Sequence, residues 1–264
     1  MPEYLEIAVE IAREAGALIA QLAQRPHEIA YKRPADLVTD ADRRSEALIV
    51  ERLHSHFPKH AIVAEEGSGL ESDSDYCWYV DPLDGTTNFA HGFPVFCVSL
   101  GLAYRGEVIA GAVYDPTREE LFTAERGAGA YLNHRRLNVS KTRTLSESLL
   151  ATGFPPFASN HEVNMELFFR LTQLSHGIRR AGSAALDLCS VAAGRFDGFW
   201  ELKLNPWDKA AGSLMVTEAG GKITDLAGRP FELLGHEIFA SNGHIHEESV
   251  QVFSEVMAQR APRA

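Results

Sequence analysis

The chain has 264 residues, of which 45% are hydrophobic and 23% charged, a composition typical of a globular protein that buries a sizeable core. Its formal net charge of −11 argues against a primary role on DNA or RNA, because nucleic-acid-binding proteins usually present a basic surface. Its 3 cysteines are widely separated, which favours reduced thiols over a disulfide framework or a zinc site.

The first half of the chain, to about residue 145, predicts two helices followed by antiparallel strands. Apolar residues recur at helical spacing between Tyr4 and Leu22, and a second helix is expected from about Thr39 to Phe57. Strands are expected at 61–64, 96–104, 108–114, 121–123 and 130–132.

The second half, about 146–264, alternates between strands and helices. Strands are expected at 148–152, 178–180 and 196–200, and helices at 163–174 and 184–193. Another helix is expected to open at Asp208 and to end at Gly220 and Gly221. No linker or repeat separates the halves, so we expect one domain over 1–264 with a layered α/β architecture.

Residues 78–89, Trp-Tyr-Val-Asp-Pro-Leu-Asp-Gly-Thr-Thr-Asn-Phe, form the most informative segment. An apolar strand leads to Asp81, and Pro82 then favours a turn because it fixes its own φ and keeps the preceding residue extended. Asp84 follows, and the next residues are expected to begin a short helix whose free amides can bind phosphate. Two carboxylates across this turn can hold one divalent cation. The alternative is a strand end followed by an Asp N-cap.

Three further segments extend this pattern. They are Asp-Leu-Val-Thr-Asp-Ala-Asp at 36–42, Ala-Glu-Glu-Gly at 64–67, and Pro-Trp-Asp-Lys-Ala-Ala-Gly at 206–212, followed by Glu-Ala-Gly-Gly at 218–221. In order and spacing the whole set resembles the inositol monophosphatase family of magnesium-dependent, lithium-sensitive phosphatases. Segments 151–155 and 180–187 resemble its bacterial branch in particular. The resemblance covers nearly the whole chain and implies the five-layer αβαβα sandwich shared with fructose-1,6-bisphosphatases.

The resemblance also implies the metal site. Hydrolysis of a phosphate ester needs a positioned water and neutralised phosphoryl charge, and two metals about 4 Å apart can supply both. An all-carboxylate set without His or Cys suits Mg²⁺. The implied metal ligands are Glu65, Asp81, the carbonyl of Leu83, Asp84 and Asp208, with Asp81 bridging two ions. The family precedent allows a third, weakly held ion, Mn²⁺ as a substitute and inhibition by Li⁺.

Catalytic and substrate-binding roles follow from the same resemblance. Glu65 and Thr86 would orient the attacking water, with Asp42 hydrogen-bonded to Thr86. The implied substrate contacts are Asp84, the amides of Gly85 and Thr86, the amide of Ala184, the carboxylate of Glu201, and Lys32. Lys32 is one residue closer to Asp36 than the family's mobile-loop lysine, so Arg33 is its alternative. Asn205 stands where the mammalian enzymes carry histidine.

Several of these residues have structural alternatives. Glu66 could replace Glu65 as the ligand, although the position at a strand end favours Glu65. Asp42 could be one of several helix-capping acids of segment 36–42. Asp208 could be a helix N-cap, which is compatible with binding a metal. Arg180 could meet a second phosphate or pair with surface acids, and we favour the surface pairing.

We expect an inositol-phosphate phosphatase, a phosphoric monoester hydrolase that acts on inositol 1-phosphate or a similar polyol phosphate through metal-activated water. Alternatives are fructose-1,6-bisphosphatase and histidinol-phosphatase activity. Activity on 3′-phosphoadenosine phosphate is a third alternative, which the short chain disfavours. The bacterial branch includes a member that also acts in transcription antitermination and ribosome maturation, so an RNA polymerase or Nus-type partner is a further alternative.

The remaining expectations concern assembly and location. Family members are commonly homodimers, and the small residues at 127–130 would permit close approach of a second chain. The N-terminal residues lack a cationic region followed by an apolar core, and no apolar run reaches membrane-spanning length. We therefore expect a cytoplasmic protein with no membrane association.

Overall fold

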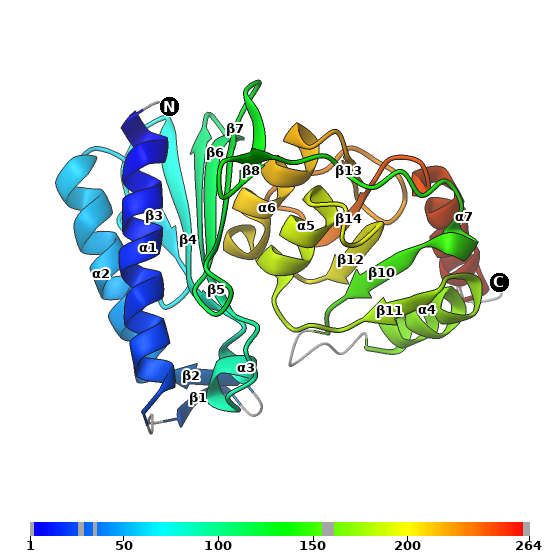
Figure 1. The fold of residues 1–264 in the computed structure, drawn as a ribbon, viewed down its shortest axis with the longest axis horizontal. Coiled ribbons are helices and arrows are strands. Elements are labelled where there is room, and N and C mark those ends of the chain that lie inside the picture. Colours follow the sequence, from blue (N-terminus) through cyan, green and yellow to red (C-terminus); the bar gives the residue numbers. More distant parts are fainter. Residues whose placement is uncertain (1–2, 26–28, 34–35, 155–160, 261–264) are drawn as a thin grey trace.

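The computed structural model describes residues 3–25, 29–33, 36–154 and 161–260, and its elements form five layers (Figure 1). Helices α1 (Glu3–Ala23) and α2 (Asp40–His56) form the first layer and cover one face of a seven-stranded sheet. The strand order of this sheet is β3-β4-β5-β6-β7-β8-β9. Its strands are β3 (Ala61–Ala64), β4 (Tyr76–Asp84), β5 (Cys97–Tyr104), β6 (Glu107–Asp115), β7 (Glu120–Glu125), β8 (Gly129–Leu132) and β9 (Arg135–Arg136).

Helices α5 (Ala184–Ala192) and α6 (Pro206–Glu218) form the central layer, between this sheet and a five-stranded sheet. The second sheet has the order β11-β10-β12-β14-β13. Its strands are β10 (Leu149–Thr152), β11 (Gly177–Arg179), β12 (Gly198–Leu202), β13 (Lys222–Thr224) and β14 (Glu237–Ser241). Helices α4 (His161–Leu174) and α7 (His246–Arg260) cover its outer face. The expected αβαβα architecture is confirmed.

Smaller elements and boundaries differ in part from expectation. The short helix expected after Asp84 is α3 (Thr86–Ala90), and α6 begins at Pro206 rather than at Asp208. The hairpin β1 (Ile29–Arg33)–β2 (Asp36–Thr39), the 3₁₀ turn η1 (Leu145–Glu147), β13, β14 and α7 were not predicted. Strand β12 begins two residues later than expected. Just before it, the Asp197 amide donates a hydrogen bond of 2.8 Å to the Leu149 carbonyl, and the Asp197 side chain accepts one of 2.6 Å from the Leu149 amide.

Three hydrophobic clusters fill the spaces between the layers. The first packs α1 and α2 against the seven-stranded sheet, through residues such as Ile11, Ile49 and Val80. The second surrounds α5 and α6 and reaches both sheets, for example through Phe122, Leu188, Met215 and Phe199. The third joins α4 and α7 to the five-stranded sheet through Leu171, Trp200 and Phe253. Each layer is therefore held by burial of apolar area on at least one face.

Helix α6 lies unusually close to the seven-stranded sheet because two strand positions opposite it are glycines. A Cβ added at Gly101 would lie 2.7 Å from the Cβ of Ala210, and one added at Gly111 would lie 3.0 Å from the Cα of Ala211. Any side chain at these positions would push the helix away from the sheet. This packing fixes α6, and with it Asp208 on its first turn, relative to β5 and β6.

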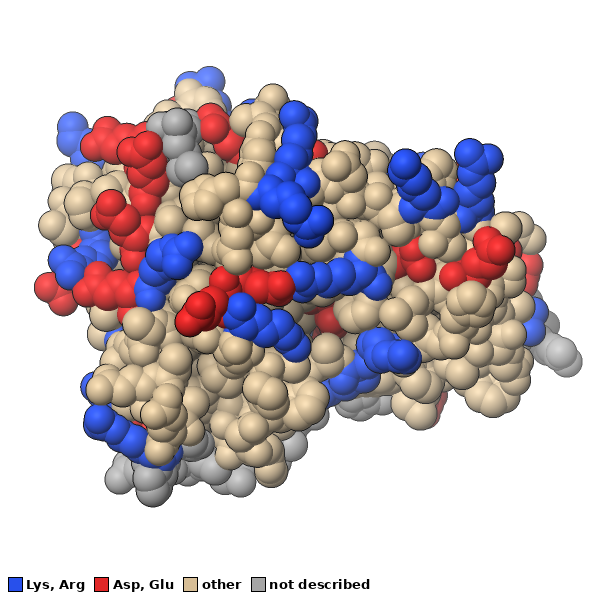
Figure 2. Space-filling model, in the orientation of Figure 1, with Lys and Arg blue, Asp and Glu red and all other residues tan. Residues whose placement is uncertain are grey.

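Charged side chains are interspersed on the surface. On the face drawn in Figure 2, Lys and Arg side chains alternate with Asp and Glu over the described residues rather than forming one basic surface. Among the helices of the described part, none combines the length and hydrophobicity that crossing a lipid bilayer requires.

Candidate active site

Strand β4 brings Asp81 and Asp84 to one end of the seven-stranded sheet. Asp81 lies opposite Ser99 of β5 and Asp84 lies opposite Cys97, so β4 contains one extra residue between the two pairs. This bulge falls at Pro82, which has no amide hydrogen for the strand ladder. The Asp81 carboxylate turns back and accepts a hydrogen bond of 3.1 Å from the Leu83 amide. The turn predicted from Pro82 is therefore a β-bulge that redirects both carboxylates.

Gly85 joins this strand to α3 with left-handed backbone, φ 97°, which a side chain would disfavour. The Thr86 hydroxyl that follows lies 2.9 Å from the Oδ1 atom of Asp42 and 3.1 Å from the carbonyl oxygen of Leu83. The predicted hydrogen bond between Thr86 and Asp42 is present. Because the Thr86 hydroxyl donates its hydrogen bond to Asp42, its oxygen retains lone pairs that can accept a further hydrogen bond.

Asp42 also caps α2. Its Oδ2 atom accepts hydrogen bonds from the Thr39 amide at 2.7 Å and the Thr39 hydroxyl at 2.6 Å, which completes a capping box. Burial raises the pKa of Asp42, while hydrogen bonds from Thr39 and Thr86 act in the opposite direction. The one carboxylate of Asp42 therefore caps α2 and also contacts Thr86.

Asp84 receives hydrogen bonds from the N-terminus of α5 in the central layer. Its Oδ2 atom accepts from the Ser183 hydroxyl at 2.6 Å and from the Ala185 amide at 2.8 Å. The Ala184 amide, expected to contact a substrate hydroxyl, also hydrogen-bonds with Asp84. Ser183 was not predicted as a site residue, although a serine directly before a helical segment is a recognisable N-cap signal. The positive end of α5 therefore supports the negative charge of Asp84.

Asp208 lies on the first turn of α6, where its carboxylate accepts a hydrogen bond of 2.6 Å from the Asn205 amide. Asn205, not Asp208, is the N-cap, and Asp208 completes the capping box from the third helical position. Desolvation raises the pKa of Asp208 well above its usual value, and the charges of Glu65 and Asp84 raise it further.

The four acidic side chains predicted as metal ligands influence one another. The pKa of Asp81 is raised well above its usual value by burial first, then by the charges of Glu65, Asp84 and Asp208, and by a side-chain hydrogen bond with Glu65. Asp81 is buried, whereas the other three are partly exposed. The neighbouring Glu66 is held through its backbone, because its amide donates a hydrogen bond of 2.6 Å to the Glu46 side chain. The structure thus brings Glu65 to Asp81 and Asp208.

A divalent cation fits this set of donors. No three His, Cys, Asp or Glu side chains of the described residues are already arranged around a common metal position. The carboxylates come from β4, from α6 and from the residue after β3 and repel one another, and a cation between them would relieve that repulsion. The donors are all oxygens, which suits Mg²⁺. The Ser99 hydroxyl opposite Asp81 is buried and has no hydrogen-bond partner within the described part of the chain.

Glu201 lies on β12 beside this cluster and is 7% exposed. Burial raises its pKa well above the usual value, and the charges of Asp187, Asp208 and Asp84 add to the effect. A Cβ added at Gly153 would lie only 2.0 Å from the Oε2 atom of Glu201. The absence of a side chain at position 153 therefore provides the space that the Glu201 carboxylate occupies.

Asp187 was not predicted from the sequence. It is buried in the first turn of α5, and burial followed by the charge of Asp84 raises its pKa well above the usual value. The charge of Arg180 opposes this rise at Asp187 and at Glu201. The side chain of Arg180 donates a hydrogen bond of 3.3 Å to the Phe154 carbonyl, and its pairing with surface acids stays a prediction. Lys32 and Arg33 lie in β1, and their side chains are outside what the structure describes.

Asn88 of α3 links the segment before β5 to the segment before α5. Its side-chain amide donates to the carbonyl oxygens of Val95 and Ala181, both at 2.8 Å. Ala181 precedes the N-terminus of α5, so this contact holds the two halves of the site together. No local sequence pattern indicates this contact of Asn88, because Ala181 lies 93 residues away.

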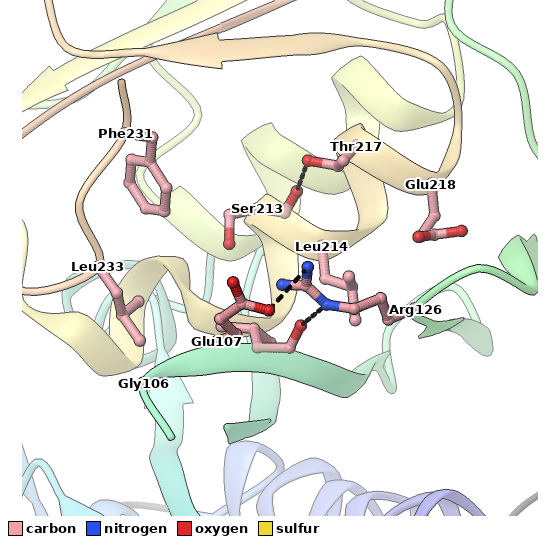
Figure 3. Close-up of a pocket in the computed structure, with 10 residues that line it drawn as sticks. Gly106, Glu107, Arg126, Ser213, Leu214, Thr217, Glu218, Phe231 and Leu233 are labelled. Atoms are coloured by element: carbon pink, nitrogen blue, oxygen red, sulfur yellow. Dashed lines mark hydrogen bonds and ion pairs between the residues drawn. The ribbon is translucent and has the colours of Figure 1, made fainter. Parts of the chain in front are cut away.

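A separate cavity of about 250 Å³ lies beside the C-terminal half of α6 (Figure 3). Arg126 forms an ion pair of 3.2 Å with Glu107 there, and Ser213, Leu214 and Phe231 complete much of the wall. The described lining residues include none of the acids above. The acidic residues of the candidate site therefore lie away from this cavity, at the N-terminal end of α6 where Asp208 is placed.

Comparison with known proteins identifies the family of the chain. The profile of the inositol monophosphatase family matches residues 1–258. The chain is 48% identical to an inositol-1-monophosphatase of Synechocystis over 95% of this chain and 88% of that protein. It is 45% identical to the Nus factor SuhB of Pseudomonas aeruginosa, over 99% and 97% respectively. The crystal structure of the extragenic suppressor protein suhB from Bartonella henselae superposes with a TM-score of 0.93 at 41% identity, covering 96% of this chain and 99% of that one. The chain therefore belongs to the inositol monophosphatase family, and this membership supports a generally metal-dependent phosphatase activity.

Proposed function

We propose that this protein is a Mg²⁺-dependent phosphomonoesterase that releases phosphate from inositol 1-phosphate or a closely similar polyol phosphate, and that the whole chain acts as one catalytic domain. The observation that carries the proposal is the convergence of Glu65, Asp81, Asp84 and Asp208. Burial raises the pKa of the three Asp residues, and the charges of the neighbouring acids raise it further at Asp81 and Asp208. Clusters of buried acidic side chains with raised pKa values are typical of functional sites.

The proposed ligands are Glu65, Asp81 and the Leu83 carbonyl for one ion and Asp81, Asp84 and Asp208 for a second. Bound Mg²⁺ would activate water and neutralise charge on the phosphoryl oxygens. The Ser183 hydroxyl and the Ala185 amide donate hydrogen bonds to Asp84, which favour its charged form against the effect of burial. The Thr86 hydroxyl, oriented by Asp42, would accept a hydrogen bond from the attacking water. The amides of Gly85 and Thr86 would bind the phosphate.

Glu201 and Ala184 are proposed contacts for the alcohol part of the substrate. Glu201 is the better supported of the two, because the charges of Asp84 and Asp208 act on its carboxylate, which therefore lies near the proposed metal ligands. In this structure the Ala184 amide already serves Asp84. Fructose-1,6-bisphosphatase and histidinol-phosphatase activity remain alternatives for the same set of acids.

A second candidate function comes from the relatives called Nus factor SuhB, which are up to 45% identical to this chain. We infer that a role with an RNA polymerase or Nus-type partner would be additional to catalysis, because all the proposed ligand residues are present here. A pull-down from lysate with the Asp81→Asn variant separates the two roles, since loss of catalysis should leave such a partner bound.

The substitution Asp81→Asn also tests the phosphatase proposal. It removes one negative charge from the acid shared by both proposed ions at nearly constant volume. We expect phosphate release from inositol 1-phosphate to fall by at least ~10³-fold, because preorganised charge stabilisation is lost.

Asp225→Asn is a matched control, since Asp225 lies in an exposed turn and pairs with Arg229 at 2.6 Å. This control should retain full activity. Near-normal turnover of Asp81→Asn in saturating Mg²⁺ would refute the assignment. A panel with fructose 1,6-bisphosphate, histidinol phosphate and glycerol 2-phosphate identifies the preferred alcohol.

A further inference from the structure

Helix α2 presents three buried polar side chains to the segments around the acids. Asp42, Ser45 and Glu46 stand at helical spacings of three and four, so they share one face of the helix. Their exposed fractions are 0%, 0% and 1%. Polar groups so deeply buried are expected to make hydrogen bonds, and each of these contacts a different segment of the site.

Ser45 contacts the bulge of β4. Its hydroxyl donates a hydrogen bond of 2.8 Å to the carbonyl oxygen of Pro82. Pro82 lies directly between Asp81 and Leu83, both of which are proposed metal ligands. This contact therefore fixes the peptide group between Pro82 and Leu83, within the bulge where the strand ladder is interrupted.

Glu46 contacts the loop that follows β3. Its Oε2 atom accepts a hydrogen bond of 2.6 Å from the Glu66 amide. Its Oε1 atom accepts from the Ser68 amide at 2.9 Å and from the Ser68 hydroxyl at 2.7 Å. The Glu65 amide is bonded to the Val80 carbonyl at 3.2 Å, so Glu46 takes over directly where the pairing of β3 with β4 ends.

We infer that Ser45 and Glu46 are positioning residues for the metal site, which set the relative placement of Glu65 and Asp81 from behind. The inference rests on the proposed function. Glu65 follows an edge strand of only four residues, which holds the loop beyond it through a hydrogen bond of 3.4 Å from the Gly67 amide to Ala64 and through the pairing of Ile62 with Leu70. The bonds to Glu46 fix the stretch between these points, directly beside Glu65. The three hydrogen bonds that the buried Glu46 carboxylate accepts fix this loop firmly, because hydrogen bonds to a charged group are stronger than those between neutral groups. Partners outside the ligand shell typically change metal affinity by about 10–100-fold.

The substitution Glu46→Gln tests the inference. It keeps the shape of the side chain but replaces one acceptor with an NH₂ group that faces donors. We expect binding of Mn²⁺, followed by electron paramagnetic resonance and calorimetry, to weaken about 10-fold or more at the tightest site. The Mg²⁺ concentration for half-maximal phosphate release should rise by a similar factor.

Glu218→Gln provides the matched control. The Glu218 carboxylate also accepts two backbone hydrogen bonds, from Gly127 at 2.8 Å and Gly129 at 2.9 Å. It lies ten residues after Asp208 on α6, about 15 Å along the helix axis. A general loss of stability would lower the Tm of both variants, whereas only Glu46→Gln should weaken Mn²⁺ binding.

The outcomes separate this inference from the proposed function. A wild-type protein that binds no Mn²⁺ and releases no phosphate would refute the proposed function. Wild-type binding that Glu46→Gln leaves unchanged would refute only the inference. If Glu46→Gln does not fold, Ser68→Ala replaces it, because it removes one donor from an exposed residue. An affinity loss of about threefold or more would then support the inference, and unchanged affinity would overturn it.

Discussion

A single methyl group at Gly153 should alter substrate selection without touching any proposed metal ligand. In Gly153→Ala the new Cβ would lie 2.0 Å from Oε2 of Glu201 and 2.3 Å from its Cδ and Oε1 atoms. The backbone at position 153 needs no left-handed conformation, so alanine is allowed there. The substitution therefore acts through displacement of the Glu201 carboxylate.

The size of the effect follows from this contact. Non-bonded carbon and oxygen atoms approach to about 3.2–3.5 Å, so the carboxylate must withdraw by roughly 1 Å or more. That shift is enough to break a hydrogen bond to a substrate hydroxyl. A lost charge-assisted hydrogen bond corresponds to about 1.5–3 kcal/mol, or roughly ten- to a hundredfold in kcat/KM.

The assay compares kcat/KM for inositol 1-phosphate and for glycerol 2-phosphate in the wild type, Gly153→Ala, Glu201→Gln and the double variant. We expect the loss on inositol 1-phosphate to be the larger one, and the double variant to lose little more than either single variant, because both act on one contact. Equal losses on both substrates would mean that Glu201 serves the metals or the fold. Full activity of Gly153→Ala on both would refute the reasoning.

Further predictions concern metal, pH and assembly. Mg²⁺ at about a hundredfold excess over its Kd should stabilise the protein by about 2.7 kcal/mol, or roughly 5–10 °C in Tm over the EDTA-treated protein, and an unchanged Tm would contradict relief of repulsion among the acids. Burial lowers the pKa of His246 to about 4 from 6.5 in the unfolded chain. The contribution of neutral, buried His246 to the free energy of unfolding is thus complete above pH 6.5 and is lost as the pH falls toward 4. Urea unfolding should show about 2 kcal/mol less stability from this group at pH 5 than at pH 7, and His246→Gln should remove that difference. Light scattering should give a dimer, and a mass near one 29.0 kDa chain at micromolar concentration would contradict it.

Local signals in the sequence predicted much of the site. Pro82 indicated the turn between Asp81 and Asp84, and the acids of segment 36–42 indicated the start of α2. The Asp42–Thr86 contact also followed, though only through the family resemblance. These features depend on neighbouring residues or on a complete motif.

Contacts between distant segments could not be predicted in this way. The pair Ser45–Pro82 is 37 residues apart and the pair Ser183–Asp84 is 99 apart, so no local pattern reports either of them. Asp187 has the spacing of an ordinary first-turn acid, and only the packing of α5 shows that it is buried beside the site. Helix α7 shows little amphipathic pattern, and its packing against α4 is likewise a long-range property.

The division of the acids between the seven-stranded sheet and the central helix α6 has a consequence for how activity arises during synthesis. Glu65, Asp81 and Asp84 all precede residue 85, whereas the donors to Asp84 and the acid Asp208 lie at 183–208. A growing chain therefore exposes the first three acids well before Ser183 and Asp208 emerge, and domains generally fold from the N-terminus as synthesis proceeds. A nascent chain that ends before α6 can form the first sheet yet still lacks part of the metal-binding set, so hydrolysis should begin only when the late helices dock.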